Sequence, residues 1–287
     1  MMKQSTLSNI GELMDITPDE IMVVCMAHQV RDGELVAQGI ATPLVAAAYL
    51  LARNTHAPNI YFSSAIGQGI CRHPAPMSLN LIESLWLDRS LVNIGFARAV
   101  SEVLPTLHPM EFLRPAQIDI NGNFNNIAFG KDYRLPRLRL PGTGGIPDVT
   151  TYLDEIMLYI PRHSRVTFVP KLDFCAGLGH NSARKHGNGP QYLVTDLGQF
   201  DYYSGKMRLT SYHHGVTIEK IQAHTGFPLE ISPLVMETPL PTESEISLLR
   251  NVIDPMNIRR LERLSGATRR EQLHKIILAE KYNNSTH

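Results

Sequence analysis

The pattern of apolar and polar residues between positions 32 and 67 predicts two strands joined by a helix. The first strand is short and apolar and follows the glycine turn at Asp32-Gly33. The helix begins after Thr42, its cap, and carries Pro43 at its first position, where the missing N–H costs nothing. A strand, a helix and a strand within about thirty residues form a βαβ unit, so the pattern predicts a parallel sheet.

The second strand of this unit ends in two hydroxyl groups. Residues 59–67 are Asn-Ile-Tyr-Phe-Ser-Ser-Ala-Ile-Gly, in which Ser63 and Ser64 follow the hydrophobic run. Ligands of open parallel sheets bind just beyond the carboxyl ends of the strands. The two serines therefore mark a candidate site, although small residues at a tight strand-to-loop turn would give the same sequence.

Comparable signals predict the other elements. Thr17 and Glu20 have the spacing of a capping box and predict a helix start after a flexible leader over residues 1–16. Asn121-Gly122 stands between two β-prone runs and predicts a hairpin. Further predicted elements are a helical stretch over 79–87, a helix near 147–154, apolar runs at 155–160 and 165–169, a hairpin over 191–211 that turns at 203–206, and helices opened by the Thr242/Glu245 and Thr268/Glu271 capping boxes and by Asp254-Pro255.

No linker in the chain is long or polar enough to separate independent domains. We expect one α/β domain over residues 17–257, built on an open, mostly parallel sheet with flanking helices, and a helical C-terminal extension over 258–287. The helix at 269–282 has a polar side and an apolar side that includes Leu273 and Ile276, which favours docking on protein over contact with nucleic acid.

Composition narrows the functional class. The 287 residues are 43% hydrophobic and 19% charged, which is typical of a globular enzyme, and their formal net charge is zero. A neutral chain has no overall field that attracts nucleic acid or an anionic membrane, and no run of eighteen apolar residues predicts a membrane span. The three cysteines are far apart and odd in number, and the first twenty residues lack a signal-peptide pattern, so we expect reduced thiols and a cytoplasmic protein.

The order and spacing of several short motifs resemble the β subunits of class I CoA-transferases, typified by glutaconate CoA-transferase. The resemblance covers residues 17–257 approximately and rests on Asp32-Gly33-Glu34, Thr42-Pro43-Leu44, Ala57-Pro58-Asn59, Ala116-Gln117-Ile118-Asp119, Gly122-Asn123, Asn125, Gly142-Thr143-Gly144-Gly145, Val194-Thr195-Asp196-Leu197-Gly198 and Thr225-Gly226-Phe227. It implies a CoA-transferase-like fold and assembly with a similar α-type subunit.

The C-terminal third is similar to a divergent branch, the small subunits of ring-opening CoA-thioester hydrolases of steroid catabolism. The motifs in this part are Met207-Arg208, His213-His214-Gly215-Val216-Thr217, Leu240-Pro241-Thr242-Glu243 and Val252-Ile253-Asp254-Pro255. A related offshoot of the family decarboxylates a glutaconyl-type CoA ester. The resemblance therefore implies a CoA thioester as substrate and no permanently bound cofactor, and it leaves three reaction types open.

The chain departs from the transferase pattern at the candidate site. In true transferases of this family a glutamate at the end of this strand attacks the acyl-CoA and carries the CoA as a thioester, and Ser63 aligns with that glutamate. A hydroxyl cannot form the acid anhydride of that pathway, and without an adjacent base it is a weak nucleophile near neutral pH. Hydrolysis, C–C cleavage or decarboxylation is therefore favoured over transfer.

Further candidate site residues come from three loops. Gly144 and Gly145, by analogy with the family, offer backbone N–H groups to an oxyanion or to the CoA, although a glycine-rich loop alone is weak evidence. Gln117 and Asn125 flank the Asn-Gly hairpin, where family resemblance implies a CoA-binding role and turn hydrogen bonding is the plainer alternative. Arg72 follows the site strand and has the chemistry to bind a substrate carboxylate, although an exposed surface arginine is the commoner case.

The histidines give a weaker signal. His213 and His214 are adjacent on a predicted strand end, so their rings face opposite sides and cannot easily share a metal ion. We therefore expect no metal site. A histidine such as His180, or Asp173 in the preceding loop, remains an alternative general acid or base.

Together these features predict a β-type enzyme subunit that acts on an acyl-CoA carrying a carboxylated or β-keto acyl group. Ser63 and Ser64 are the candidate catalytic residues: they line the acyl pocket and hydrogen-bond the thioester or a carboxylate, while the partner supplies an acid or base. Two alternatives stay open: a genuine CoA-transferase subunit, and a catalytically silent scaffold whose partner carries every reactive group.

Overall fold

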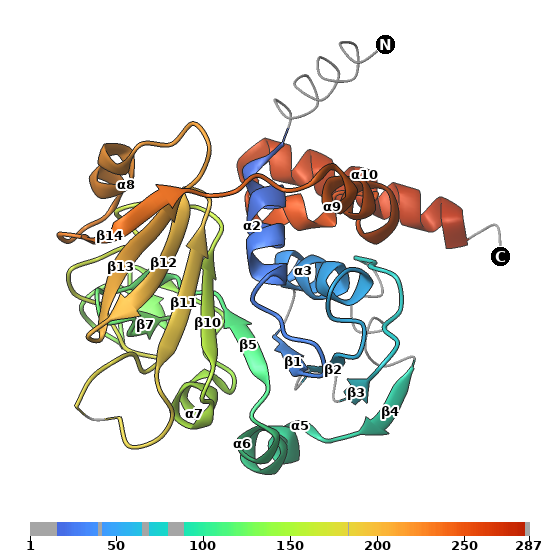
Figure 1. Ribbon diagram of the computed structural model, residues 1–287. Coiled ribbons are helices and arrows are strands. Elements are labelled where there is room, and N and C mark those ends of the chain that lie inside the picture. Colours follow the sequence, from blue (N-terminus) through green and yellow to red (C-terminus); the bar gives the residue numbers. More distant parts are fainter. Residues whose placement is uncertain (1–15, 40–41, 65–68, 80–88, 183, 285–287) are drawn as a thin grey trace.

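A ten-stranded mixed sheet forms the centre of the protein, as seen in a computed structural model that describes residues 16–39, 42–64, 69–79, 89–182 and 184–284 (Figure 1). The strand order is β14-β13-β12-β11-β10-β5-β1-β2-β3-β4. The strands are β1 (Leu35–Gln38), β2 (Tyr61–Ser64), β3 (Gly69–Cys71), β4 (Ser90–Asn93), β5 (Met110–Leu113), β10 (Ile156–Ile160), β11 (Pro190–Thr195), β12 (Gly198–Tyr203), β13 (Lys206–Tyr212) and β14 (Glu230–Glu237).

The middle of this sheet is parallel, as the sequence predicts. Strands β2, β1, β5, β10 and β11 pair in parallel. Antiparallel pairings add β3 and β4 on one side and β12 and β13 on the other, where the edge strand β14 pairs in parallel with β13. The helix between β1 and β2 is α3 (Pro43–Asn54), so the predicted βαβ unit is confirmed. The candidate strand end at Ser64 thus belongs to the parallel region.

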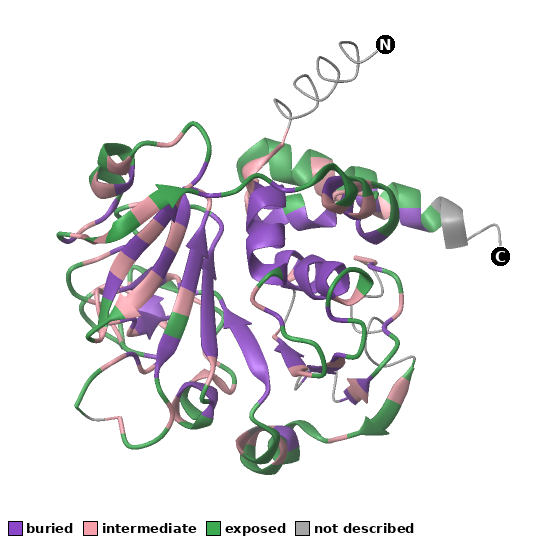
Figure 2. Ribbon diagram, viewed as in Figure 1, coloured by how far each residue is buried: buried purple, intermediate pink, exposed green. Residues whose placement is uncertain are grey.

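Each face of the central strands carries its own apolar core. Helices α2 (Pro18–Ala27) and α3 cover one face, and nearly all of their residues are buried (Figure 2). The other face packs against α7 (Ile146–Tyr152) and α8 (Ile218–His224) and includes Leu113, Ile156 and Leu158. Successive side chains of a strand point to opposite faces, so alternate residues of β5 enter different cores.

The beginning of α3 is capped differently from the prediction. Thr42 occupies the cap position and Pro43 the first helical position, but the Thr42 hydroxyl accepts no bond from the helix. Instead Glu262, 218 residues further along the chain, accepts the Leu44 N–H at 2.9 Å. The C-terminal segment therefore completes a helix of the N-terminal unit.

Two predicted hairpins are confirmed. Around Asn121-Gly122, β6 (Gln117–Ile118) pairs with β7 (Phe124–Asn125), and Gly122 has φ of +76°. Strands β12 and β13 form the second hairpin, whose turn residues Ser204 and Gly205 both have positive φ. A further small pair joins β8 (Ala128–Phe129) to β9 (Leu138–Arg139).

The C-terminal helices pack on α2 and α3 rather than standing apart. They comprise α9 (Glu243–Leu248), a π-helical turn (Leu249–Ile253), a 3₁₀-helix (Ile258–Glu262) and α10 (Gly266–Asn284). The Thr242/Glu245 capping box is present, whereas the prediction that Thr268 caps a helix is wrong because α10 begins at Gly266. The predicted apolar side of the last helix docks on the same chain, with Ile276 in the core.

Arg259 anchors this packing. Its guanidinium is 1% exposed and lies 3.0 Å from carboxylate oxygens of Asp19, Glu20 and Asp254. Asp19 and Glu20 belong to α2, so a buried ion-pair cluster joins the two ends of the chain.

Helices α5 (Phe96–Arg98), α6 (Leu104–Leu107) and the π-helical turn between them (Ala99–Val103) connect β4 to β5. The predicted leader and the predicted helical stretch at 79–87 lie almost entirely outside the described residues. No helix of the described chain is both long enough and apolar enough to span a bilayer.

Candidate functional site

Ser63 and Ser64 are the last two residues of β2, and both are buried. The Ser63 hydroxyl donates a hydrogen bond to the Val36 carbonyl of β1 at 3.1 Å. A hydroxyl that is used in this way, in the interior of a sheet, stabilises the strand pair.

The neighbours of Ser63 across the sheet include a carboxylate. Ala37 of β1 pairs with Ser63 of β2 on one side and with Glu111 of β5 on the other. Paired residues of parallel strands point to the same face, and neighbouring strands are about 4.8 Å apart, so Glu111 and Ser63 lie roughly 10 Å apart on one face. The structure thus places a buried glutamate two strands away from Ser63.

Glu111 is buried and has no polar partner in the described part of the chain. Its relative exposure is 7%, and no hydrogen bond or ion pair reaches its carboxylate there. Burial disfavours the charged form and raises the pKa of Glu111 to about 7. Such a carboxyl group exchanges protons near neutral pH.

A local signal for Glu111 is present in the sequence, although the motifs above do not include it. The residue stands in the run Met-Glu-Phe-Leu, where one carboxylate interrupts an otherwise apolar strand. A charged residue inside a buried strand is costly unless it is paired or functional. The significance of Glu111 depends on its partner strands, which the local pattern does not identify.

Glu111 lines a pocket at the carboxyl ends of β1 and β5. The pocket has a volume of about 430 Å³, and its lining is mostly apolar. Ala37, Leu113 and Val149 contribute apolar surface, and the loop Gly142–Gly145 forms another part of its wall. Neither Ser63 nor Ser64 is among the lining residues.

The glycine loop has the conformation that its sequence suggests. Gly142 and Gly144 have φ of +116° and +51°, a region that favours glycine, and Gly145 is the residue before α7. A Cβ on Gly145 would lie 3.2 Å from a methyl group of Val100. Gly144 and Gly145 line the pocket together with Thr143, and the glycines, which carry no side chain, contribute backbone to its wall.

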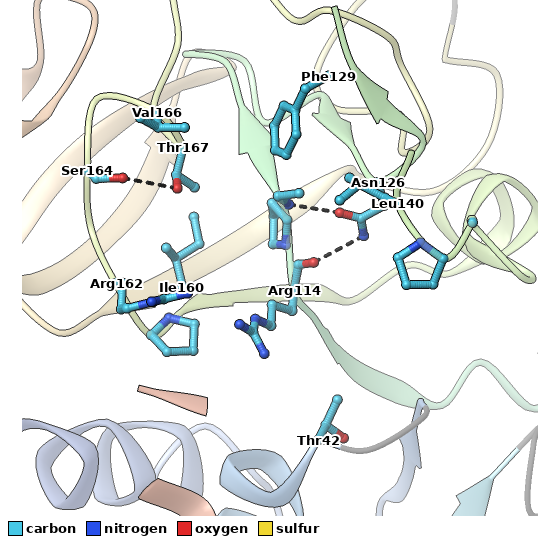
Figure 3. A pocket seen from close by; sticks show the side chains of 15 residues that line it. Thr42, Arg114, Asn126, Phe129, Leu140, Ile160, Arg162, Ser164, Val166 and Thr167 are labelled. Atoms are coloured by element: carbon cyan, nitrogen blue, oxygen red, sulfur yellow. Dashed lines mark hydrogen bonds between the residues drawn. The ribbon is translucent and has the colours of Figure 1, made fainter. Parts of the chain in front are cut away.

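A second, more open pocket of about 790 Å³ adjoins the first (Figure 3). Five residues line both pockets: Thr42, Arg114, Asn126, Pro141 and Gly142. Arg114 and Arg162 give it two cationic groups, and Arg162 is exposed. Figure 3 shows the two guanidinium groups on the same side of the pocket.

Arg114 is held in place by Glu262. One guanidinium nitrogen, Nη1, donates to Glu262 Oε2 at 3.0 Å, and the Tyr159 hydroxyl donates to the same oxygen at 2.9 Å. The Arg114 side chain remains 40% exposed. The cation is therefore fixed by the C-terminal segment while part of it stays accessible.

Gln117 and Asn125 use their side chains within the hairpin. Asn125 Nδ2 donates to Gln117 Oε1 at 2.8 Å and to the Ala128 carbonyl at 2.7 Å. Gln117 Nε2 donates to Asp173 at 3.3 Å, and that carboxylate also accepts the Gly130 N–H. Neither side chain lines either pocket, whereas the next residue, Asn126, lines both.

Arg72 lies far from this site along the strand direction. β3 runs antiparallel to β2, and Cys71 pairs with Phe62, so Arg72 follows at the end of β2 opposite to Ser64. Its guanidinium contacts the Asn59 side-chain oxygen at 3.4 Å and lies over the Tyr61 ring. The structure thus does not bring Arg72 to the pocket, and Arg114 is the arginine found there.

The adjacent histidines have separate partners, as the alternation predicts. His213 is buried, donates from Nε2 to the Thr195 carbonyl and accepts at Nδ1 from Thr238, and burial lowers its pKa to about 4. His214 is exposed and pairs with Glu237. His180 bonds the Pro190 carbonyl at 2.6 Å. The described residues contain no group of three metal-ligating side chains.

Comparison with protein families and known proteins gives a consistent result. Residues 20–224 match the family described as Coenzyme A transferase. The chain is 31% identical over 261 residues to the B-type subunit of 3-oxoadipate CoA-transferase from Pseudomonas knackmussii, covering 81% of this chain and 91% of that protein. It is 28% identical to the B-type subunit of glutaconate CoA-transferase from Acidaminococcus fermentans, with 86% and 96% covered. It is also 28% identical to the cholesterol ring-cleaving hydrolase IpdB subunit of Mycobacterium tuberculosis, with 85% and 97% covered.

A solved structure adds a third chemistry. The decarboxylase AibA/AibB superposes with a TM-score of 0.74 at 28% identity, covering 85% of this chain and 98% of the compared chain. The similar proteins thus include a transferase subunit, a hydrolase subunit and a decarboxylase on one fold.

Proposed function

Because the chain belongs to the coenzyme A transferase family, we propose that it is the β-type subunit of a two-subunit enzyme that acts on an acyl-CoA thioester. The observation that carries this proposal is the pair of adjoining pockets at the carboxyl ends of β1 and β5. One is small and mostly apolar, and the other is open and contains two arginines, which suits an acyl group joined to a phosphate-bearing CoA.

The acyl group occupies the apolar pocket in this proposal. Arg114, at the junction of the two pockets, binds the carboxylate or keto oxygen of the acyl chain. The backbone N–H groups of Gly144 and Gly145 stabilise negative charge on the thioester oxygen. Gln117 and Asn125 act indirectly, by holding the hairpin loop that carries Asn126 to both pockets. The CoA thioester is the substrate, and no permanent cofactor is required.

The reaction is hydrolysis, C–C cleavage or decarboxylation rather than CoA transfer. The support is chemical: the family resemblance implies that Ser63 stands where the transferases carry their glutamate, and its hydroxyl is bonded to a backbone carbonyl. A serine without a base partner is poorly suited to covalent capture of the acyl group. Arg72, which the sequence suggested for substrate binding, is replaced in this role by Arg114.

The partner is an α-type subunit of the same family. The named relatives are B-type subunits, and AibA/AibB is a two-component protein. Phe96, which lines the acyl pocket, is 43% exposed, and Leu91 of the edge strand β4 is 65% exposed. We place this apolar edge under the partner.

The thiols of Cys25, Cys71 and Cys175 are unpaired, which suits the cytoplasm.

The experiment that tests this function uses the two subunits co-purified as a complex. Glutaconyl-CoA and 3-oxoadipyl-CoA are incubated with and without acetate, and all CoA species are followed by mass spectrometry. We expect acyl-CoA consumption that does not depend on acetate. Stoichiometric formation of acetyl-CoA would establish the alternative, a genuine transferase, which the relative at 31% identity favours.

A further inference from the structure

We propose that Glu111 is a catalytic residue of this subunit, the group that moves protons to and from the bound acyl-CoA. The inference rests on the proposed function and adds the reactive group that the Ser63 position no longer supplies. It starts from the location of the carboxylate, between two strands whose carboxyl ends form the pocket.

The register of the sheet directs Glu111 toward the acyl pocket. Its β5 neighbours Met110 and Phe112 belong to the core under α2 and α3, so Glu111 points to the opposite face. On that face the adjacent residue of β1 is Ala37, whose small side chain leaves the space open. Gly39, which also lines the pocket, lies beside the carboxylate, since a Cβ there would contact Glu111 Oε1 at 3.8 Å.

Glu111 has no structural task that explains a carboxylate at this position. In the described residues it caps no helix, forms no ion pair and accepts no hydrogen bond. The other deeply buried acidic side chains contrast with it, because Glu262 and Asp254 hold arginines and backbone N–H groups. An apolar residue of similar size would be more stable than an unpaired buried carboxyl group. A costly group on a pocket wall, with its oxygens unoccupied, is typical of a catalytic site.

None of the charged and titratable groups around Glu111 offsets the negative charge of its carboxylate. On α3, the Tyr49 hydroxyl donates to the Ala37 carbonyl at 2.9 Å; on β10, the Tyr159 hydroxyl donates to Glu262. Arg114, which directly follows β5, is bonded to Glu262, and Asp148 of α7 is exposed. Glu102, in the π-helical turn, pairs with Arg98. None of these groups forms an ion pair with Glu111, so burial alone sets its proton affinity.

The step assigned to Glu111 is a proton transfer. In hydrolysis, the carboxylate form of Glu111 takes a proton from the attacking water as the water oxygen bonds to the acyl carbon. In decarboxylation, CO₂ leaves the substrate and this first proton transfer does not occur. In its acid form Glu111 gives a proton to the departing thiolate or to the carbanion, and its O–H bond breaks as the new S–H or C–H bond forms. In hydrolysis, the proton that Glu111 took from water is the one it gives to the leaving group. After decarboxylation, a proton from water returns Glu111 to its acid form, so no oxidant or reductant is needed.

The test uses the two-subunit complex with glutaconyl-CoA and 3-oxoadipyl-CoA. Glu111→Gln keeps the size and shape of the side chain and removes the exchangeable proton. We expect turnover to fall by about 10²- to 10⁴-fold, the range of general acid–base catalysis, while the Kd of a non-reactive thioether analogue changes by less than about threefold. The pH profile of the wild-type complex should contain an ionisation near neutrality that the residual activity of the variant lacks.

The control is Glu102→Gln, an exposed carboxylate on the segment that also supplies Val100 to the pocket. Its turnover should stay within about twofold of wild type.

If the wild-type complex consumes the acyl-CoA and Glu111→Gln does so within a few-fold, the inference is overturned and the proposed function stands. If the wild-type complex consumes neither thioester, the proposed function and the inference both fail. A variant that loses activity and analogue binding equally would show a positioning role only and would also contradict the inference.

Discussion

Glu111 and Ser63 lie in one row of the central sheet, on the same face, with Ala37 alone between them. The Ser63 hydroxyl bonds the Val36 carbonyl, and the buried carboxylate of Glu111 stands two strands away from it. Glu111 lies on the wall of an apolar pocket that neither Ser63 nor Ser64 lines.

Glu111 should make the protein less stable at alkaline pH. Burial raises its pKa from 4.5 to about 7, so the unfolded chain releases this proton at a lower pH than the folded one. The folded state therefore loses stability as pH rises from about 4.5 to about 7 and recovers none above it, a difference on the order of 3 kcal/mol. Glu111→Gln should melt at a higher temperature than wild type at pH 8 and differ little at pH 4.5. Equal melting temperatures at pH 8 would contradict the assignment of an unpaired buried carboxyl group.

The hydroxyl groups at the end of β2 should contribute to packing more than to catalysis. Ser63→Ala removes the bond to the Val36 carbonyl and should cost about 1 kcal/mol of unfolding free energy. Turnover by the complex of the Ser63→Ala, Ser64→Ala double variant should remain within about fivefold of wild type. A loss of 100-fold or more, about 2.7 kcal/mol in activation free energy, would show that a serine takes part in the reaction. Unchanged turnover in this variant and in Glu111→Gln together would favour a silent scaffold.

Arg162 should bind the CoA part of the substrate. It is exposed, lines the open pocket and has no hydrogen bond or ion pair in the described residues. Arg162→Ala should raise KM for the acyl-CoA about five- to tenfold with little change in kcat, because it removes a charge-assisted contact made equally in ground and transition states. The effect should shrink at high salt. Arg165→Ala, an exposed arginine of the same loop outside the pocket, is the control, and equal effects of the two substitutions would refute the placement of the CoA.

Arg259 should be required for the C-terminal segment to dock. Arg259→Met leaves the buried carboxylate of Asp254 without its cation and removes the nearer cation of Asp19, at a cost of about 3–5 kcal/mol. Because Glu262 lies at the end of the same 3₁₀-helix, loosening this segment should also release Arg114 and raise KM. Arg260→Met, the exposed neighbour, should change stability by less than about 0.5 kcal/mol. Denaturant unfolding of both variants measures the difference, and similar midpoints would contradict a stabilising role for the cluster.

Local sequence signals predict the parts of the fold that depend on neighbours in the chain. The βαβ unit follows from the alternation around Pro43, and the hairpin follows from Asn121-Gly122, where only a residue that tolerates positive φ fits. The position of the candidate serines at a strand end follows in the same way. These features need a few residues on either side and no knowledge of strand order.

The remaining features depend on residues that are far apart in sequence. The cap of α3 comes from Glu262, and the same side chain positions Arg114. Glu111 is significant only because β5 lies next to β1 and turns this residue toward Ala37. Arg72 follows β2 in sequence, which suggests a place near the site, but the antiparallel turn into β3 takes it to the other end of the strand.

The central claim is that this chain processes an acyl-CoA without holding the CoA on a carboxylate of its own. The most direct measurement is the intact mass of this subunit, taken by mass spectrometry from the complex during turnover of glutaconyl-CoA or 3-oxoadipyl-CoA. The account predicts that the mass stays that of the unmodified chain while the substrate is consumed. A population heavier by one CoA less one water, the mass of a thioester at Glu111 or at any other carboxylate of the chain, would contradict it.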